Sequence, residues 1–236
     1  MNSKYVFILI ITIVSSFFLS LASEGFKDKR NKNIEIDKKK NILSSIGLDI
    51  ESFNISDIDN YFKNYIDTLI INLDGDVIDN ISISDLYEIE NKSTGEVKYY
   101  YNDNEYLPMY IETEKGVMIM PVSGKGLWSS LFGYFAIDTN NYSTVKGITF
   151  YAHGETPGLG AEISKKWFQN NFIGKEIYSL NNMLKSIIVV KGKAASDSKY
   201  EVDGISGATI TSNGVTQLLD RDLKRYEPYF IKNRKR

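Results

Sequence analysis

The sequence contains no cysteine and a single histidine, His153, among its 236 residues. Without cysteine the chain can form no disulfide, ligate no iron–sulfur cluster through thiolates and attach no haem through a Cys-x-x-Cys-His motif. One histidine also excludes a multi-histidine metal site within the chain. No nucleophile or acid–base pair stands out either. Any redox chemistry here must therefore use an organic cofactor, and the sequence predicts no metal site and no catalytic residue.

The chain also lacks an excess of charge of either sign. Its 28 basic and 30 acidic residues give a net charge of −2, and no basic stripe is interleaved with aromatic residues. Nucleic acid is therefore not an expected partner. Hydrophobic residues make up 42% of the chain and charged residues 25%, which is the composition of a globular protein.

The longest apolar run covers residues 5–22 near the N-terminus and contains no charged residue. As a helix it would span about 27 Å, close to the roughly 30 Å of a bilayer's hydrocarbon core. A cleaved signal peptide is the alternative, and the following Leu-Ala-Ser-Glu resembles a cleavage site. The length of the run favours a retained anchor over residues 1–23. More basic residues follow the run than precede it, which would keep the domain cytoplasmic, but that rule weakens before a long domain.

The next portion, residues 24–120, combines helices with short strands. Residues 24–45 are charged and helix-compatible, with a solvated linker as the alternative. Apolar residues recur at helical spacing through residues 50–71, a helix that Ser56 or Asp57 could cap. Asp74-Gly75 marks a turn. Residues 76–120 alternate and are rich in Ile, Val and Tyr, with hairpin-turn signals at Ser-Thr-Gly and Lys-Gly, so they predict an antiparallel sheet.

The last portion, residues 121–236, has glycine clusters between short strand-like runs. We expect strands at GYFAID, TVKGITFYA and KSIIVVKG, a helix over 162–173 and a final amphipathic helix over 212–227. No strand-linked G-x-G-x-x-G opens a helix, so a dinucleotide-binding doubly wound sheet is not expected. The fold class is α+β, with a mainly antiparallel, twisted sheet and flanking helices after the N-terminal transmembrane helix.

One motif in this portion carries chemistry: Asp203-Gly204-Ile205-Ser206-Gly207-Ala208-Thr209. It reads as a loop of small, hydroxyl-rich residues ahead of a helix, and helix N-termini bind phosphate well. An ordinary N-capped helix start is the alternative. The run resembles the acceptor motif of proteins flavinylated through a phosphoester, in which a dedicated flavin transferase attaches FMN to the last threonine.

This resemblance implies covalent FMN on Thr209. Thr211 is the nearby competitor for the attachment, and the register of the motif argues against it. Ser206, Gly207 and Ala208 would keep the loop open for the transferase and the phosphate. Asp203 would serve either the modification or the loop.

A second block, HGETPGLGAE over His153–Glu162, resembles a signature shared by the C component of the sodium-translocating NADH:quinone reductase and the G component of the Rnf complex. GKGLWSSLFGY, over Gly124–Tyr134, favours the former. The resemblance implies a subunit that relays single electrons and completes no reaction alone. Its implied partners are components A, B, D, E and F, the flavin transferase and the bacterial inner membrane, with NADH and ubiquinone handled elsewhere. It also implies a single-pass topology with the domain facing the periplasm.

The same resemblance implies which residues surround the flavin ring. They are Glu155, Thr156, Gly158, Leu159 and Gly160, where Thr-Pro-Gly favours a tight turn. Lys191 is either a cation at the N1–C2 edge of the ring, where charge tunes flavin electronics, or a surface lysine. Trp128 would either shield the flavin or fill the core. His153 is expected to be structural or solvent-facing.

Three other functions remain open on the sequence. An Rnf-type subunit would share the flavin and the topology but exchange electrons with ferredoxin. A stand-alone anchored flavoprotein would purify without membrane partners. A structural binding module would stay colourless after co-expression with the transferase.

Overall fold

The computed structural model describes residues 3–234 of the chain. The chain divides into two compact units, residues 1–39 and residues 40–236. The first unit holds helix α1, Ser3–Gly25, and most of helix α2, Lys27–Ser45. Helix α1 is long and apolar enough to cross a membrane. The helix expected within residues 24–45 is confirmed, and the linker alternative for that segment is wrong.

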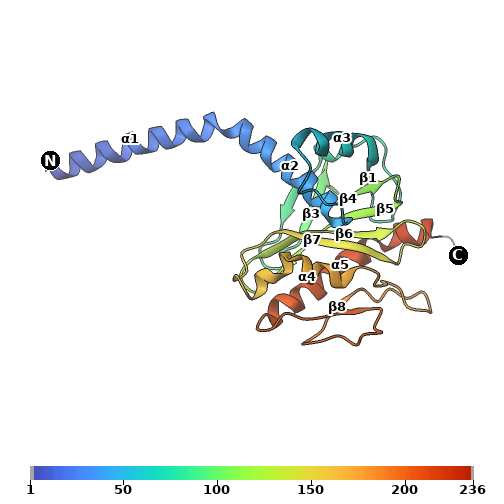
Figure 1. Ribbon diagram of the computed structural model, residues 1–236. Helices are drawn as coiled ribbons and strands as arrows, with labels where there is room; N and C mark the ends of the chain where they lie inside the picture. Colours follow the sequence, from blue (N-terminus) through green and yellow to red (C-terminus); the bar gives the residue numbers. More distant parts are fainter. Residues whose placement is uncertain (1–2, 235–236) are drawn as a thin grey trace. The chain divides into compact units, whose positions relative to one another are not determined.

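A seven-stranded antiparallel sheet organises the second unit (Figure 1). Its path runs β2-β3-β4-β5-β6-β7, and β1 pairs with β4. The strands are β1 Ile66–Ile71, β2 Tyr87–Glu90, β3 Val97–Tyr101, β4 Asn104–Glu112, β5 Val117–Lys125, β6 Ser130–Asp138 and β7 Val145–Ala152. A separate two-stranded parallel ribbon joins β8, Ile188–Val189, to β9, Glu201–Val202. The expected α+β class with a mainly antiparallel sheet is confirmed. The expected division at residues 120 and 121 falls inside β5, so both portions share one sheet.

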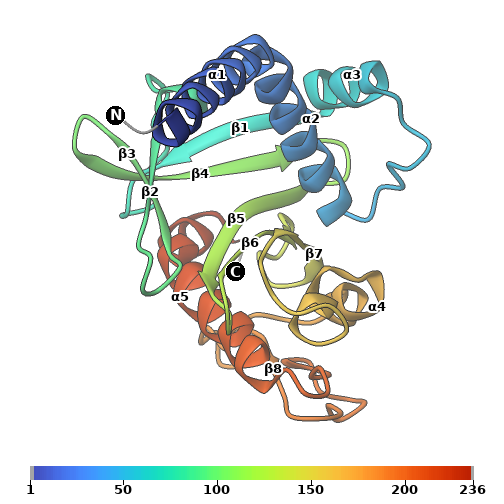
Figure 2. The same cartoon turned by 90° about the vertical axis from the view of Figure 1, so that its left-hand side faces the viewer.

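Helices cover the sheet from two sides (Figure 2). Helix α5, α4 and the β8 ribbon lie on one side of β6 and β7, and helix α3 lies with β1 on the other. The helices of the second unit are α3 Ile55–Tyr65, α4 Lys166–Gln169 and α5 Thr209–Asn233, with 3-10 turns η1 Ile83–Asp85, η2 Gly160–Ser164 and η3 Asn170–Phe172. Helix α5 packs across β5 and contributes Val215, Leu218 and Leu219 to the core.

The expected helix over residues 50–71 is only half right. Helix α3 ends at Tyr65, and Ile66–Ile71 forms β1, paired with β4 from Ile66 opposite Glu112 to Ile71 opposite Leu107. The β-branched residues of this run gain more by completing the sheet than by extending an amphipathic helix.

The N-cap of helix α3 also differs from the expected Ser56 or Asp57. The cap is Asn54, whose side chain accepts from the Asp57 N–H at 3.0 Å. Asp57 returns a bond to the Asn54 N–H and so completes a capping box. Asp57 is therefore part of the cap but not the cap residue itself.

Three expectations near the C-terminus need correction. The helix expected over 162–173 is three short pieces, η2, α4 and η3, because the chain turns repeatedly to bury Ile163, Phe168 and Phe172. The KSIIVVKG strand shortens to β8. The final helix is longer than 212–227 and begins at Thr209, so the last motif residue belongs to its first turn and not to the preceding loop.

Candidate cofactor site

The motif ends where helix α5 begins. Ala208 is the N-cap residue and is buried, whereas the Thr209 side chain is exposed. Gly207 has φ +74°, in the region that favours glycine, and a Cβ there would meet Leu159 Cδ2 at 2.8 Å. The first N–H groups of a helix have no intrahelical acceptor. The geometry therefore presents the Thr209 hydroxyl to solvent at the positive end of a 25-residue helix.

A cavity of about 370 Å³ opens beside Thr209. It is lined by residues of two segments and of the helix start: Val189, Val190, Lys191, Gly192, Lys193, Gly204, Ile205, Ser206, Gly207, Thr209, Ser212 and Asn213. Lys191 and Lys193 both line this cavity and are exposed, and Lys193 is ion-paired with Asp203. The cavity thus joins an acceptor hydroxyl, a helix N-terminus and two cations, a combination suited to phosphate.

Asp203 ties the two segments of this cavity together. It forms an ion pair with Lys193 and accepts a hydrogen bond from the Ala194 N–H at 2.9 Å. The hydrogen bond from Lys193 and that from Ala194 lower the pKa of Asp203, so the residue is ionised at neutral pH. Of the two roles left open for Asp203, these contacts support the structural one, in which it holds the loop.

Glu155 is almost fully buried, with 5% of its surface exposed. Its carboxylate accepts hydrogen bonds from the N–H groups of Leu127 at 3.1 Å, Trp128 at 2.9 Å and Ser129 at 3.2 Å, and from the Thr211 hydroxyl at 2.5 Å. Burial raises the pKa of Glu155, but the bonds from Thr211 and from the backbone outweigh it and the net pKa is lowered. The carboxylate is thus engaged with protein donors.

The turn after Glu155 brings the second motif to the first. Leu159 N–H donates to the Thr156 carbonyl at 3.1 Å, and Gly158 has φ +75°, so the expected tight turn is present. Gly160 is buried beside Glu155, and Leu159 is 42% exposed and lies against Gly207. The structure therefore places Thr156–Gly160 next to the start of helix α5, although the two motifs are far apart in the sequence.

The hairpin between β5 and β6 packs against helix α5 and lines a neighbouring cavity with Gly124, Lys125 and Gly126. A Cβ on Gly214 of α5 would lie 2.2 Å from the Lys125 carbonyl oxygen, so this hairpin touches the helix backbone directly. Leu127 is 45% exposed and Trp128 is 68% exposed. The alternative in which Trp128 fills the core is therefore wrong. His153 is half-buried and accepts from the Glu155 N–H through Nδ1 at 3.3 Å.

Sequence reasoning missed two features of this site. Thr211 is more than a competitor for attachment, because its buried hydroxyl is a partner of Glu155. Lys193 carries no sequence-based expectation, although it pairs with Asp203 and lines the cavity. The signal for Thr211 is its position two residues after Thr209 at the start of the same helix. The signal for Lys193 is its spacing of two from Lys191 in KGK.

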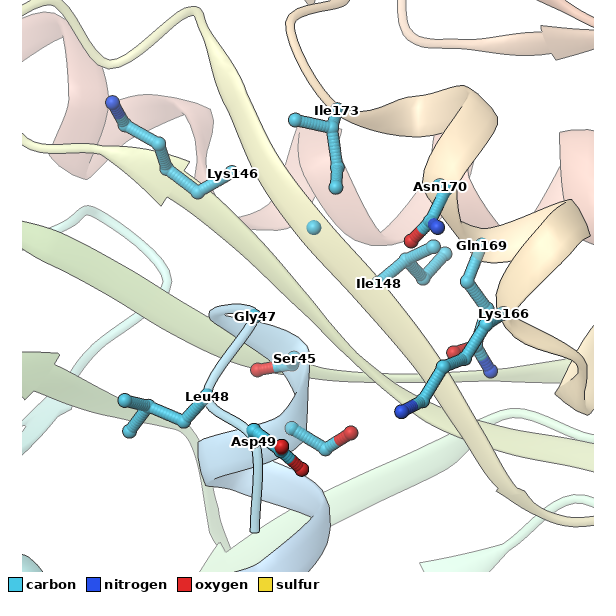
Figure 3. A pocket seen from close by; sticks show the side chains of 12 residues that line it. Ser45, Gly47, Leu48, Asp49, Lys146, Ile148, Lys166, Gln169, Asn170 and Ile173 are labelled. Carbon is cyan, nitrogen blue, oxygen red and sulfur yellow. The ribbon is translucent and has the colours of Figure 1, made fainter. Parts of the chain in front are cut away.

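A second cavity, shown in Figure 3, is smaller, at about 150 Å³, and shares no residue with the first. It lies between Ser45–Asp49, β7 and the α4–η3 segment. Its two lysines are engaged in ion pairs, Lys146 with Asp138 at 2.7 Å and Lys166 with Glu51 at 3.4 Å. Within residues 3–234, no cluster of three His, Asp or Glu residues could hold a metal ion. The cavity at Thr209 is the candidate site because its lining includes the motif residues Ser206, Gly207 and Thr209.

Comparison with known proteins identifies the family of this chain. The family model described as FMN-binding domain matches residues 126–224, which include both motifs and the start of α5. The C component of the Na(+)-translocating NADH-quinone reductase of Vibrio alginolyticus is 32% identical, covering 95% of this chain and 91% of the relative. The same component from Vibrio anguillarum is 35% identical over 92% of this chain and 88% of the relative.

Two solved structures share the fold. The crystal structure of the same reductase component from Parabacteroides distasonis has a TM-score of 0.70 at 30% identity, covering 86% of this chain and 96% of that one. The crystal structure of Shewanella oneidensis NqrC has a TM-score of 0.67 at 23% identity, over 82% and 94%. Fold and site define a protein with an FMN-binding domain. More particularly, the chain belongs to the NqrC family, the C components of the Na+-translocating NADH-quinone reductases.

Proposed function

We propose that this chain is the electron-transfer flavoprotein subunit of a Na+-translocating NADH:quinone reductase and that it carries FMN as a phosphoester on Thr209. The observation that supports Thr209 over Thr211 is their different exposure. The Thr209 side chain is exposed beside the cavity, whereas Thr211 is 1% exposed and its hydroxyl is bonded to Glu155. A transferase can reach only the first of these hydroxyls without unfolding the helix.

The residues around Thr209 fit the parts of FMN. The helix N-terminus and the cations Lys191 and Lys193 would stabilise the phosphate, and Ser206 supplies a further exposed hydroxyl. The exposed apolar side chains of Trp128, Leu159 and Ile210 would cover an aromatic ring. FMN would supply one-electron chemistry that no side chain of this chain offers. The phosphoester would keep the cofactor from being lost outside the cytoplasm.

The proposal includes a location and partners. Helix α1 would anchor the chain in the bacterial inner membrane, with the second unit facing the periplasm. The electron donor and acceptor would be cofactors of components A, B, D, E and F, because this chain alone completes no reaction. Maturation would need a flavin transferase, which must act on the same side of the membrane as the motif.

The test is the intact mass of the full-length chain, purified in detergent after co-expression with a flavin transferase. The wild-type chain should gain the mass of FMN less one water, and Thr209→Ala should gain nothing. Thr211→Ser, which keeps a hydroxyl on Glu155, should carry the same added mass as wild type. Added mass that survives Thr209→Ala and disappears in Thr211→Ala would move the attachment to the other threonine. No added mass in the wild type would refute the covalent-flavin function.

A further inference from the structure

The Glu155 carboxylate is the meeting point of three segments that the sequence separates widely. Its hydrogen bonds reach the β5–β6 hairpin at Leu127–Ser129, and its bond to Thr211 reaches the first turn of α5. Glu155 itself opens the Thr156–Gly160 turn. All four of these donors are uncharged groups of the protein, so the carboxylate neutralises no lysine or arginine through them. Its contacts hold backbone segments in place.

Gly126 and Gly160 lie against the Glu155 carboxylate, where neither position has room for a side chain. A Cβ on Gly126 would lie 2.6 Å from Glu155 Oε1, and a Cβ on Gly160 would lie 2.7 Å from Glu155 Oε2. Real Cβ atoms do not approach an oxygen so closely, so both positions admit only glycine while the carboxylate stays where it is. The hairpin and the turn can thus close on Glu155 from two sides.

The Trp128 side chain, next to the Glu155 carboxylate, is mostly exposed. Trp128 is 68% exposed, yet its N–H is bonded to Glu155 Oε1 at 2.9 Å. Glu155 Oε2 is bonded to Thr211, two residues beyond the proposed attachment site. One carboxylate therefore links the Trp128 backbone to the first turn of the helix that carries Thr209.

We propose that Glu155 is a positioning residue, which fixes the Trp128 loop on the first turn of α5 so that the indole flanks the cofactor held by Thr209. The cofactor part of this inference rests on the proposed function. The loop-fixing part does not, because it concerns only contacts within the chain. Removing the anionic acceptor should release the loop, let the Trp128 side chain move and weaken its contact with the ring.

The first arm of the test uses flavin-free protein. The chain has two tryptophans, so Trp167→Phe leaves Trp128 as the only one, and Thr209→Ala prevents flavin attachment. In full-length protein of this background, Glu155→Gln should lower the fluorescence anisotropy of Trp128 and increase its quenching by acrylamide. Glu162→Gln is the matched control, because the Glu162 carboxylate accepts from the Trp167 indole at 2.8 Å and not from the loop, and Trp167→Phe has already removed that donor. That control should leave Trp128 unchanged.

The second arm uses the flavinylated Trp167→Phe protein, with FMN content fixed by intact mass. Tryptophan in contact with an excited flavin quenches its emission, so Trp128→Phe should brighten the flavin and lengthen its mean fluorescence lifetime. Glu155→Gln should shift the flavin emission in the same direction. Thr211→Val should do so to a smaller degree, and Thr211→Ser should restore the parent emission. This Thr211 pair carries the test if Glu155→Gln does not fold, as judged by circular dichroism.

Unchanged Trp128 anisotropy in a folded Glu155→Gln protein would overturn the positioning role. A fall in anisotropy without any change in flavin emission would overturn the part that places Trp128 beside the ring. Absence of FMN mass in the parent would refute the proposed function, and the flavin-free arm would still decide whether Glu155 holds the loop.

Discussion

Gly214 provides a sharp test of how helix α5 meets the β5–β6 hairpin. Alanine in place of an exposed helical glycine stabilises a protein by about 1 kcal/mol. At Gly214 the added Cβ would lie 2.2 Å from the Lys125 carbonyl oxygen and 3.2 Å from its carbonyl carbon. Helix and hairpin backbones must then separate, and such overpacking costs about 1–3 kcal/mol. Because neither backbone can rotate aside as a side chain would, we expect a net loss of about 2 kcal/mol.

The assay is thermal unfolding of the flavinylated full-length protein, followed by circular dichroism. For a unit of this size, about 2 kcal/mol corresponds to a Tm lower by about 4–8 °C. Gln217→Ala, at an exposed position on the same helix, is the control and should change stability by no more than about 0.5 kcal/mol. A Tm for Gly214→Ala equal to or above that of wild type would show that the helix is free at this point and would refute the contact.

Two further predictions concern residues outside the cofactor site. Burial raises the pKa of Asp222 on α5 from 3.8 to about 6, so its stabilising contribution is full below 3.8 and is lost as the pH rises through 6. The loss amounts to about 3 kcal/mol. In urea unfolding, Asp222→Asn should remove this pH dependence of the free energy of unfolding. The same dependence on pH in wild type and variant would contradict the prediction. Asn54→Ala removes the acceptor for the Asp57 N–H and should lower the Tm by about 2–4 °C. Asn54→Ser should lie between alanine and wild type, and an alanine variant with unchanged Tm would show that this cap adds nothing.

Local sequence signals predicted much of the fold. The uncharged run of α1, the alternating strands and the apolar face of α5 each follow from periodicity, which acts over a few residues. The prediction of a helix over all of 50–71 was wrong because periodicity does not detect pairing with a distant strand. Ile66 and Leu69 fit helical spacing, but pairing with β4 decided their conformation, and the partner strand lies some forty residues further along the chain. Likewise, the fragments over 160–172 follow the demands of burial at Phe168 and Phe172.

The sequence by itself determined the two motifs, the need for an organic cofactor in any redox role and the identity of the residue expected to carry it. Only the tertiary structure decided which hydroxyl is reachable and what the acidic residue of the second motif does. The motif register favours Thr209 over Thr211, but only the fold shows that the Thr209 side chain is exposed and that the Thr211 hydroxyl donates a hydrogen bond to Glu155. The burial and hydrogen bonds of Thr211 and Glu155 depend on segments that are distant in the sequence, namely the β5–β6 hairpin and the Thr156–Gly160 turn. A local sequence pattern does not predict which distant segments pack together.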